Sequence, residues 1–208
     1  SINMTQSRPS PHPASNHVSR PTRADAEAAV RTLIAWTGED PNRPGLRQTP
    51  TRVVQAYQEY FKGYLEDPDH WLATEDDDLS RGYDDMVMLS GIRVQSFCEH
   101  HMTPFEGRAS VAYLPDRLYV GLSRLARVVD TFARRLQTQE ALTHQVAETI
   151  ERNLRPRGVA ILIEAEHHCI SFRGIRQSGI TTTTTRFLGQ FEGDDNIRQR
   201  FLMLCDRS

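Results

Sequence analysis

The chain has 208 residues, a formal net charge of −2 at pH 7 and an isoelectric point of about 6.4. Such a balanced charge produces no global field that would attract nucleic acid or an anionic membrane, and no apolar run approaches the roughly 20 residues of a membrane span. The N-terminal segment has no apolar core of a signal peptide, and three cysteines without an export signal do not indicate a disulfide framework. We therefore expect a cytoplasmic protein of one domain with extensions.

The N-terminal part of the chain is predicted to carry no catalytic group. Residues 1–23 are rich in proline and serine and contain almost no large apolar side chain, which predicts a disordered tail. Residues 24–85 are predicted to form a helical region. Within it, the acidic run 75–78 is expected to be a solvated loop, because it lacks the glycine and the spaced oxygen ligands of a calcium loop.

Two helices are predicted in this region. A capping box, Thr22-x-x-Asp25, indicates the start of the first helix, and Gly38 indicates its end. Thr49 followed by Pro50 is typical of the first residues of a second helix. The apolar stripe of that second helix is expected to be core or subunit contact.

From residue 86 onward the pattern changes to strands and amphipathic helices, and residues 86–208 are predicted to be the catalytic domain. The predicted strands are 86–88, 92–97, 105–114, 158–172 and 181–187, and the predicted helices begin at Ser123 and at about Gln139. This order predicts an α+β fold with a mainly antiparallel sheet.

A group of potential metal ligands follows the second predicted strand. Cys98 and His101 are three residues apart within Cys98-Glu99-His100-His101, so one turn of chain can present both to a single ion. Thiolate and imidazole are preferred zinc ligands, and a catalytic zinc site uses three protein ligands and leaves one position for water. With Cys169 as the third ligand, the sequence predicts a zinc site that has His100 and His167 beside it, unligated.

The geometry near Cys169 depends on the predicted strand 158–172. If the strand continues to its end, His167 and Cys169 share one face of the sheet and His168 points to the other. A structural zinc site is the alternative, and it would need a fourth ligand such as Cys205 or Asp206. A nucleobase deaminase is excluded because its His-x-Glu and Pro-Cys-x-x-Cys patterns are missing.

Arginines supply a second indication. Arg124 and Arg127 share one face of a predicted helix, and Arg173 follows Cys169 by four residues. Guanidinium groups bind phosphate oxygens well, although a solvated helix surface explains such arginines equally simply. Glu140 stands in the first turn of a predicted helix, where the helix dipole stabilises a carboxylate. A carboxylate can equally accept hydrogen bonds from the paired donors of a guanine edge, and both explanations stay open.

Several blocks, in order, resemble the GTP cyclohydrolase I family over roughly Asp25 to the C-terminus. They are Glu39-Asp40-Pro41 with Gly45-Leu46, Thr49-Pro50-x-Arg52-Val53, Cys98-Glu99-His100-His101, Gly121-Leu122-Ser123-x-Leu125-x-Arg127, Gln139-Glu140-x-Leu142-Thr143, His167-x-Cys169 with Arg173-Gly174, and Leu188-Gly189-Gln190-Phe191. The resemblance implies a tunnelling fold, in which helices pack on one face of the sheet and subunits pool their sheets into a β-barrel. It also implies a homodecamer of two pentameric rings, with active sites between subunits.

The resemblance also implies a role for each matched residue. The zinc ligands would be Cys98, His101 and Cys169; the catalytic residues His100, His167 and Ser123; and the substrate-binding residues Gln139, Glu140, Arg124, Arg127 and Arg173. Arg124 stands where many members have lysine, so it keeps the charge but changes the shape.

The implied reaction converts GTP to 7,8-dihydroneopterin triphosphate and formate, the first step of tetrahydrofolate and pterin synthesis. Zinc would activate water for attack on C8 of guanine, while His167 or His100 protonates N7. Two alternatives stay open from the sequence. One is an enzyme that stops at the ring-opened formamide or acts on a related pterin, and the other is a non-catalytic zinc protein that binds a nucleotide as a sensor.

Overall fold

The computed structural model describes residues 19–73 and 82–207. Most of the predicted tail and the acidic run 75–78 therefore lie outside the described residues. The chain forms two compact units, Ser1–Tyr57 and Gln58–Ser208, and the domain division predicted at residues 24 and 86 stays a prediction. No helix of the described residues is long and apolar enough to cross a membrane.

The first unit contains helix α1 (Arg23–Trp36) and most of α2 (Thr49–Tyr60). The predicted capping box is confirmed: the Thr22 side chain accepts from the Asp25 amide, and the Asp25 carboxylate accepts from the Thr22 amide. Gly38 follows the helix with φ of +95°, a conformation that glycine adopts without strain. α1 buries none of its residues, and Trp36 is 84% exposed.

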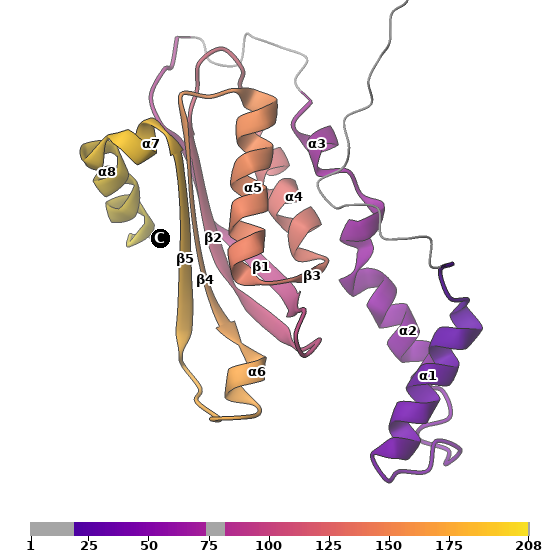
Figure 1. The fold of residues 1–208 in the computed structure, drawn as a ribbon. Coiled ribbons are helices and arrows are strands. Elements are labelled where there is room, and N and C mark those ends of the chain that lie inside the picture. The colour runs from indigo at the N-terminus through magenta and orange to yellow at the C-terminus, as the bar shows by residue number, and fades with distance from the viewer. Residues whose placement is uncertain (1–18, 74–81, 208) are drawn as a thin grey trace, which may run out of the picture. The chain divides into compact units, whose positions relative to one another are not determined.

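A five-stranded sheet dominates the second unit, in the order β3-β1-β2-β4-β5 (Figure 1). β1, β2, β4 and β5 pair antiparallel, and only the short β3 runs parallel to its neighbour β1. The predicted α+β class with a mainly antiparallel sheet is therefore confirmed. The strands are β1 (Val87–Cys98), β2 (Pro104–Leu114), β3 (Leu136–Gln137), β4 (Gly158–His167) and β5 (Thr181–Gly189).

Two strand boundaries differ from the sequence prediction. The predicted strands 86–88 and 92–97 are replaced by the single strand β1, which begins at Val87. An irregularity between Leu89 and Ile92, with Gly91 at φ of +71°, accounts for the break in alternation. The strand predicted over 158–172 ends at His167, where the chain enters a short helix instead.

Helices cover both faces of this sheet. α4 (Leu122–Ala133) and α5 (Gln139–Leu154) lie on one face, and α7 (Gln190–Gly193) and α8 (Asp195–Cys205) lie on the other (Figure 1). Successive side chains of β2 point to opposite faces of the sheet, and each face carries its own core. Val111 and Tyr113 belong to the core under α4 and α5, whereas Ala112 and Leu114 belong to a second core with Phe191 and Phe201 of α7 and α8. The expectation of helices on one face thus holds for α4 and α5, whereas α7 and α8 were not predicted. The remaining short elements are η1 (Lys62–Leu65), α3 (Pro68–Trp71) and α6 (His168–Ser171).

Candidate functional site

The hairpin between β1 and β2 presents the first two potential metal ligands. The Cys98 amide donates to Thr103 O and the Met102 amide donates to Cys98 O, both at 2.8 Å, so the loop closes as a tight turn. Met102 takes φ of +52°, which reverses the chain within a few residues. This turn brings the His101 imidazole back beside the Cys98 thiol at the end of β1.

The third potential ligand comes from the short helix α6. The prediction that His167 and Cys169 share a face of one strand is wrong, because the chain leaves the sheet after His167 and the Phe172 amide donates to His168 O. Cys169 nevertheless reaches the hairpin turn. The ligand atoms of Cys98, His101 and Cys169 lie within 4.8 Å of one another.

The chemistry of these three donors fits a metal ion. Two sulfurs that share a tetrahedral zinc ion are about 3.8 Å apart, so donor atoms within 4.8 Å of one another need to move by no more than about 1 Å to share an ion. Burial and the neighbouring Cys98 thiol raise the pKa of Cys169, and a bound cation would offset both effects. Cys205, the fourth ligand of the alternative structural site, lies instead at the end of α8 beside the second core. Its thiol bonds to Ser110, and the pKa of Cys205 is raised by burial.

His167 is fixed beside this group by two contacts. Its ring stacks on Phe105 at a centroid distance of 4.5 Å and an interplanar angle of 8°, because the β2–β4 register pairs these two residues. Its Nε2 lies 2.8 Å from Gln139 Oε1. Burial lowers the pKa of His167, Glu140 raises it, and His168 lowers it further. Glu140 is therefore close enough to influence the imidazole electrostatically.

Two more predicted residues join the same cluster. His100 Nδ1 lies 3.8 Å from Cys98 Sγ, and the His100 side chain is largely exposed. Arg173, in the loop after α6, has Nη1 at 3.2 Å from His101 Nε2. His100 and Arg173 therefore contact the potential metal ligands Cys98 and His101, while Gln139 and Glu140 lie near His167.

Ser123, Arg124 and Arg127 lie elsewhere in the chain. The C-terminal end of α4 leads to β3, which pairs with Cys98, whereas Ser123 and Arg124 lie in the first turn of α4 and Arg127 lies halfway along it. At a rise of about 1.5 Å per residue, the 12 residues of α4 span about 18 Å. Arg124 donates to Ala73 O at 2.6 Å, and the Arg127 guanidinium lies 4.8 Å from the centre of the Trp71 ring.

Comparison with known proteins now identifies the family. The sequence profile of GTP cyclohydrolase I matches residues 26–206. The chain belongs to the GTP cyclohydrolase I family. A GTP cyclohydrolase 1 of Hyphomonas neptunium is 52% identical over 196 residues, covering 94% of this chain and 95% of that protein. A GTP cyclohydrolase 1 of Brucella anthropi is 55% identical over 188 residues, covering 90% and 88%.

The chain is also similar to a solved structure at low sequence identity. The crystal structure of the archaeosine synthase QueF-Like in the apo form matches with a TM-score of 0.43 and 19% identity, covering 50% of this chain and 94% of that chain.

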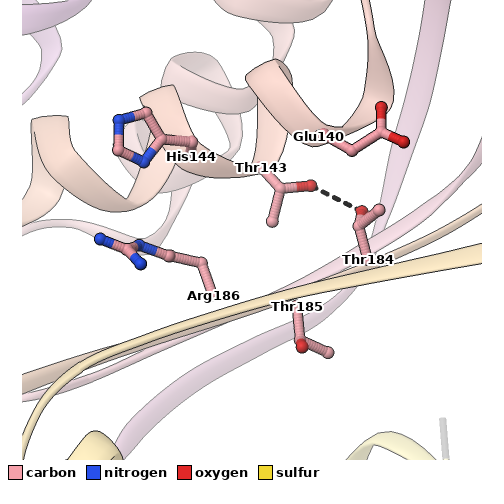
Figure 2. Close-up of a pocket in the computed structure, with 6 residues that line it drawn as sticks. All are labelled: Glu140, Thr143, His144, Thr184, Thr185 and Arg186. Carbon is pink, nitrogen blue, oxygen red and sulfur yellow. Dashed lines mark hydrogen bonds between the residues drawn. The ribbon is translucent and has the colours of Figure 1, made fainter.

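This GTP cyclohydrolase I family member also has a pocket between α5 and β5. Figure 2 shows Glu140 and Thr143 on α5 facing Thr184 and Arg186 on β5, with a hydrogen bond of 2.7 Å between the two threonines. The pocket holds about 150 Å³, less than the roughly 300 Å³ at which sites for whole ligands begin. One chain therefore offers room for part of a nucleotide beside Glu140.

Sequence reasoning missed several residues near this site. Phe105 reaches His167 through strand register, which no local pattern reveals. Thr184 and Arg186 were part of a predicted strand, and their alternation gave a signal that both face the same side of the sheet. His144 stands one turn beyond Glu140 and lines the same pocket.

Proposed function

We propose that this protein is a zinc-dependent GTP cyclohydrolase I that hydrolyses GTP to 7,8-dihydroneopterin triphosphate and formate. The observation that carries the proposal is the group of three potential metal ligands, Cys98, His101 and Cys169, together with the imidazole of His167, which lies two residues before Cys169 and is held by Gln139 and Phe105. The high identity to proteins named GTP cyclohydrolase 1 supports the same activity.

Zinc is the metal that best suits the donor set. Two thiolates and one imidazole are soft to intermediate ligands that zinc prefers, and three protein ligands are typical of a catalytic zinc site. When bound, zinc supplies Lewis acidity that makes water a nucleophile near neutral pH. The remaining chemistry must come from side chains of the protein.

Proton transfer is the proposed role of the two unligated histidines. His167 is held rigidly against Phe105 and would give a proton to N7 as the imidazole ring of guanine opens. His100 is exposed next to Cys98 and would be the second proton carrier. Ser123 would assist proton transfer during rearrangement of the ribose.

Substrate binding is assigned to charged and polar side chains around the pocket. The Glu140 carboxylate would accept the paired donors of the guanine edge, with Gln139 next to it. Arg173 would bind the triphosphate, since a guanidinium matches phosphate oxygens in geometry and charge. Arg124 and Arg127 would bind the same triphosphate from another position.

The separation between these residues supports an active site shared between subunits. Ser123 and Arg124 lie in the first turn of α4, at the end remote from the metal ligands, and Arg127 lies halfway along the same helix. A second copy of the chain would bring them to the site. The loop after α6 carries exposed apolar side chains, Phe172 at 80% and Ile175 at 69%, which suits a subunit contact. We propose the tunnelling fold, in which subunits pool their sheets into a β-barrel, and a homodecamer of two pentameric rings. A location in the cytoplasm is part of the same proposal.

The proposal is tested by incubating purified protein with GTP, with and without prior treatment by a chelator. We expect dihydroneopterin triphosphate and formate, identified by mass and by a formate assay, with loss of turnover after chelation and recovery with zinc. A ring-opened product without formate would instead indicate an enzyme that stops early. Intact GTP that stays bound to the zinc-loaded protein would indicate a sensor.

A further inference from the structure

Gln139 is buried at the junction of α5 with the sheet. Its side chain is 1% exposed. Its amide nitrogen lies 3.0 Å from Ile163 O on β4 and 2.9 Å from Thr182 O on β5, and it also lies 3.1 Å from Thr184 Oγ1. Its amide oxygen lies 2.8 Å from Nε2 of His167. Both atoms of the amide are therefore engaged within the protein.

These contacts decide the orientation of the amide. A backbone carbonyl can only accept hydrogen bonds, so the Gln139 nitrogen must face Ile163 O and Thr182 O. The reverse orientation would place its oxygen against two carbonyl oxygens, which share no hydrogen. The Gln139 oxygen must then face His167, and a bond of 2.8 Å requires the hydrogen to lie on His167 Nε2.

Stacking on Phe105 also restrains the imidazole ring of His167. Phe105 is fully buried, and its ring lies nearly parallel to that of His167. The stack sets the plane of the imidazole, and the bond to Gln139 sets its rotation within that plane. Nδ1 is then the one ring nitrogen of His167 that is left for a substrate.

We propose that Gln139 is a positioning residue that holds His167 as the Nε2–H tautomer and leaves Nδ1 to exchange the proton with the substrate. This inference rests on the proposed function and deepens it, because it names the atom at which His167 acts. It also gives Gln139 a role other than the substrate contact predicted from the resemblance, since a buried amide with both atoms engaged has no donor left for guanine.

A purely structural role for Gln139 makes a different prediction. Its amide also joins α5 to β4 and β5, and the Thr143 hydroxyl donates to Gln139 O while bonding to Thr184. Gln137 is a second buried glutamine, and its amide nitrogen donates to Phe132 O and to Gln145 Oε1, both at 2.9 Å. Gln137→Leu makes the same change at this other buried amide, so it is the matched control for Gln139→Leu. If Gln139 only joined elements, both variants would lower stability and activity in parallel.

The test measures the tautomer directly, in the zinc-loaded protein without nucleotide. Magic-angle-spinning NMR of protein labelled with ¹⁵N-histidine reports which ring nitrogen is protonated, and His167→Gln assigns the signal. We expect Nε2–H for His167 in the unaltered chain and in Gln137→Leu, with slow hydrogen exchange at that position. In Gln139→Leu the exchange should become fast. An Nδ1–H tautomer in the unaltered chain would overturn the proposal even if the Gln139 variant does not fold.

Kinetics complete the test. Gln139→Leu should lower kcat about 10-fold or more, as loss of an orienting partner does, and should change KM for GTP less than about 3-fold. A rise in KM with unchanged kcat would show substrate contact instead, and an equal loss of kcat in Gln137→Leu would show a structural role. Failure of the proposed function would be seen separately, as absence of turnover in the unaltered chain with the tautomer result intact.

Discussion

Arg173 Nη1 lies 3.2 Å from His101 Nε2, so a predicted phosphate-binding residue contacts a potential metal ligand. Arginine has donors only, and a neutral imidazole has a single lone pair. The bond from Arg173 therefore uses the one lone pair with which His101 could bind a metal. Whichever ring nitrogen His101 offers, metal binding must break this hydrogen bond and release Arg173 toward the nucleotide.

Replacing Arg173 should therefore strengthen metal binding while weakening substrate binding. Arg173→Met removes a competing hydrogen bond of about 0.5–1.5 kcal/mol, so zinc affinity without nucleotide should rise about 2- to 10-fold. Competition with a chromophoric chelator measures it. Arg176→Met, in the same exposed loop, is the control and should leave zinc affinity unchanged. Equal or lower zinc affinity in Arg173→Met would contradict the competition.

Substitution of a metal ligand and substitution of a proton carrier should have different effects on zinc content and turnover. Cys169→Ala removes a thiolate from a three-ligand site, so both zinc content and turnover should be lost. His167→Ala leaves the three donors in place, so zinc should remain while turnover falls by at least about 100-fold. Zinc content by elemental analysis and product formation from GTP measure the two effects. Full zinc occupancy in Cys169→Ala would refute the assignment of Cys169 as a ligand.

Two inactive variants should restore activity to each other if the active site joins two subunits. Arg127 lies halfway along α4 with its guanidinium over the Trp71 ring, whereas His167 lies two residues before Cys169 and contacts Gln139. We expect Arg127→Ala and His167→Ala each to be inactive alone, and mixed oligomers formed by refolding together to regain about a quarter of native sites. Turnover of GTP measures the gain. A mixture as inactive as its components would mean that each site comes from one chain.

The sequence predicted those parts of the site that depend on local order. The spacing of Cys98 and His101 predicted a shared ion, and the turn closed by Cys98 and Met102 brings their donor atoms together. The run before Cys169 is apolar enough to predict a strand, but strand propensity cannot show where pairing stops. β4 has no partner residue on β2 beyond Phe105, so the chain is free to turn into α6 there.

Contacts between distant segments could not be predicted from the sequence. The stack of Phe105 on His167 requires the register of β2 against β4, and the bond from Gln139 requires α5 to lie across the sheet. The C-terminal helix α8 was missed because Phe201 alone contributes a fully buried residue to it, so its apolar period is weak. Tertiary packing, not local pattern, determines these features.

A methyl group at Gly107 should separate the two strands that carry Phe105 and His167. An added Cβ would lie 1.8 Å from Glu164 O and 2.6 Å from Ala165 Cα, both rigid backbone atoms of β4. Gly107→Ala should therefore lower the free energy of unfolding by about 3 kcal/mol or more. Gly193→Ala, where nothing lies within 4 Å of the added atom, is the control and should change it by less than about 1 kcal/mol. Chemical denaturation measures the free energy of unfolding of both variants. Equal values would show that β2 and β4 can shift apart freely.

The ion pair between Asp85 and Arg200 should make the stability of the protein depend on pH in the acidic range. Arg200 on α8 lies 2.5 Å from the Asp85 carboxylate just before β1, and the Met86 amide donates to the same carboxylate. Arg200, followed by the Met86 amide, lowers the pKa of Asp85 below its ordinary value. The stabilisation is therefore complete above the unfolded-state pKa, near 4, and is lost as pH falls through the lower folded-state value. Asp85→Asn should reduce stability at pH 7 by at most about 1 kcal/mol, because the pair is half exposed, and the difference should shrink toward pH 3. Denaturant titrations at several pH values measure the difference in stability between Asp85→Asn and the unaltered chain, and Asp84→Asn is the control. A difference that stays constant with pH would rule out the Asp85 carboxylate as the titrating group.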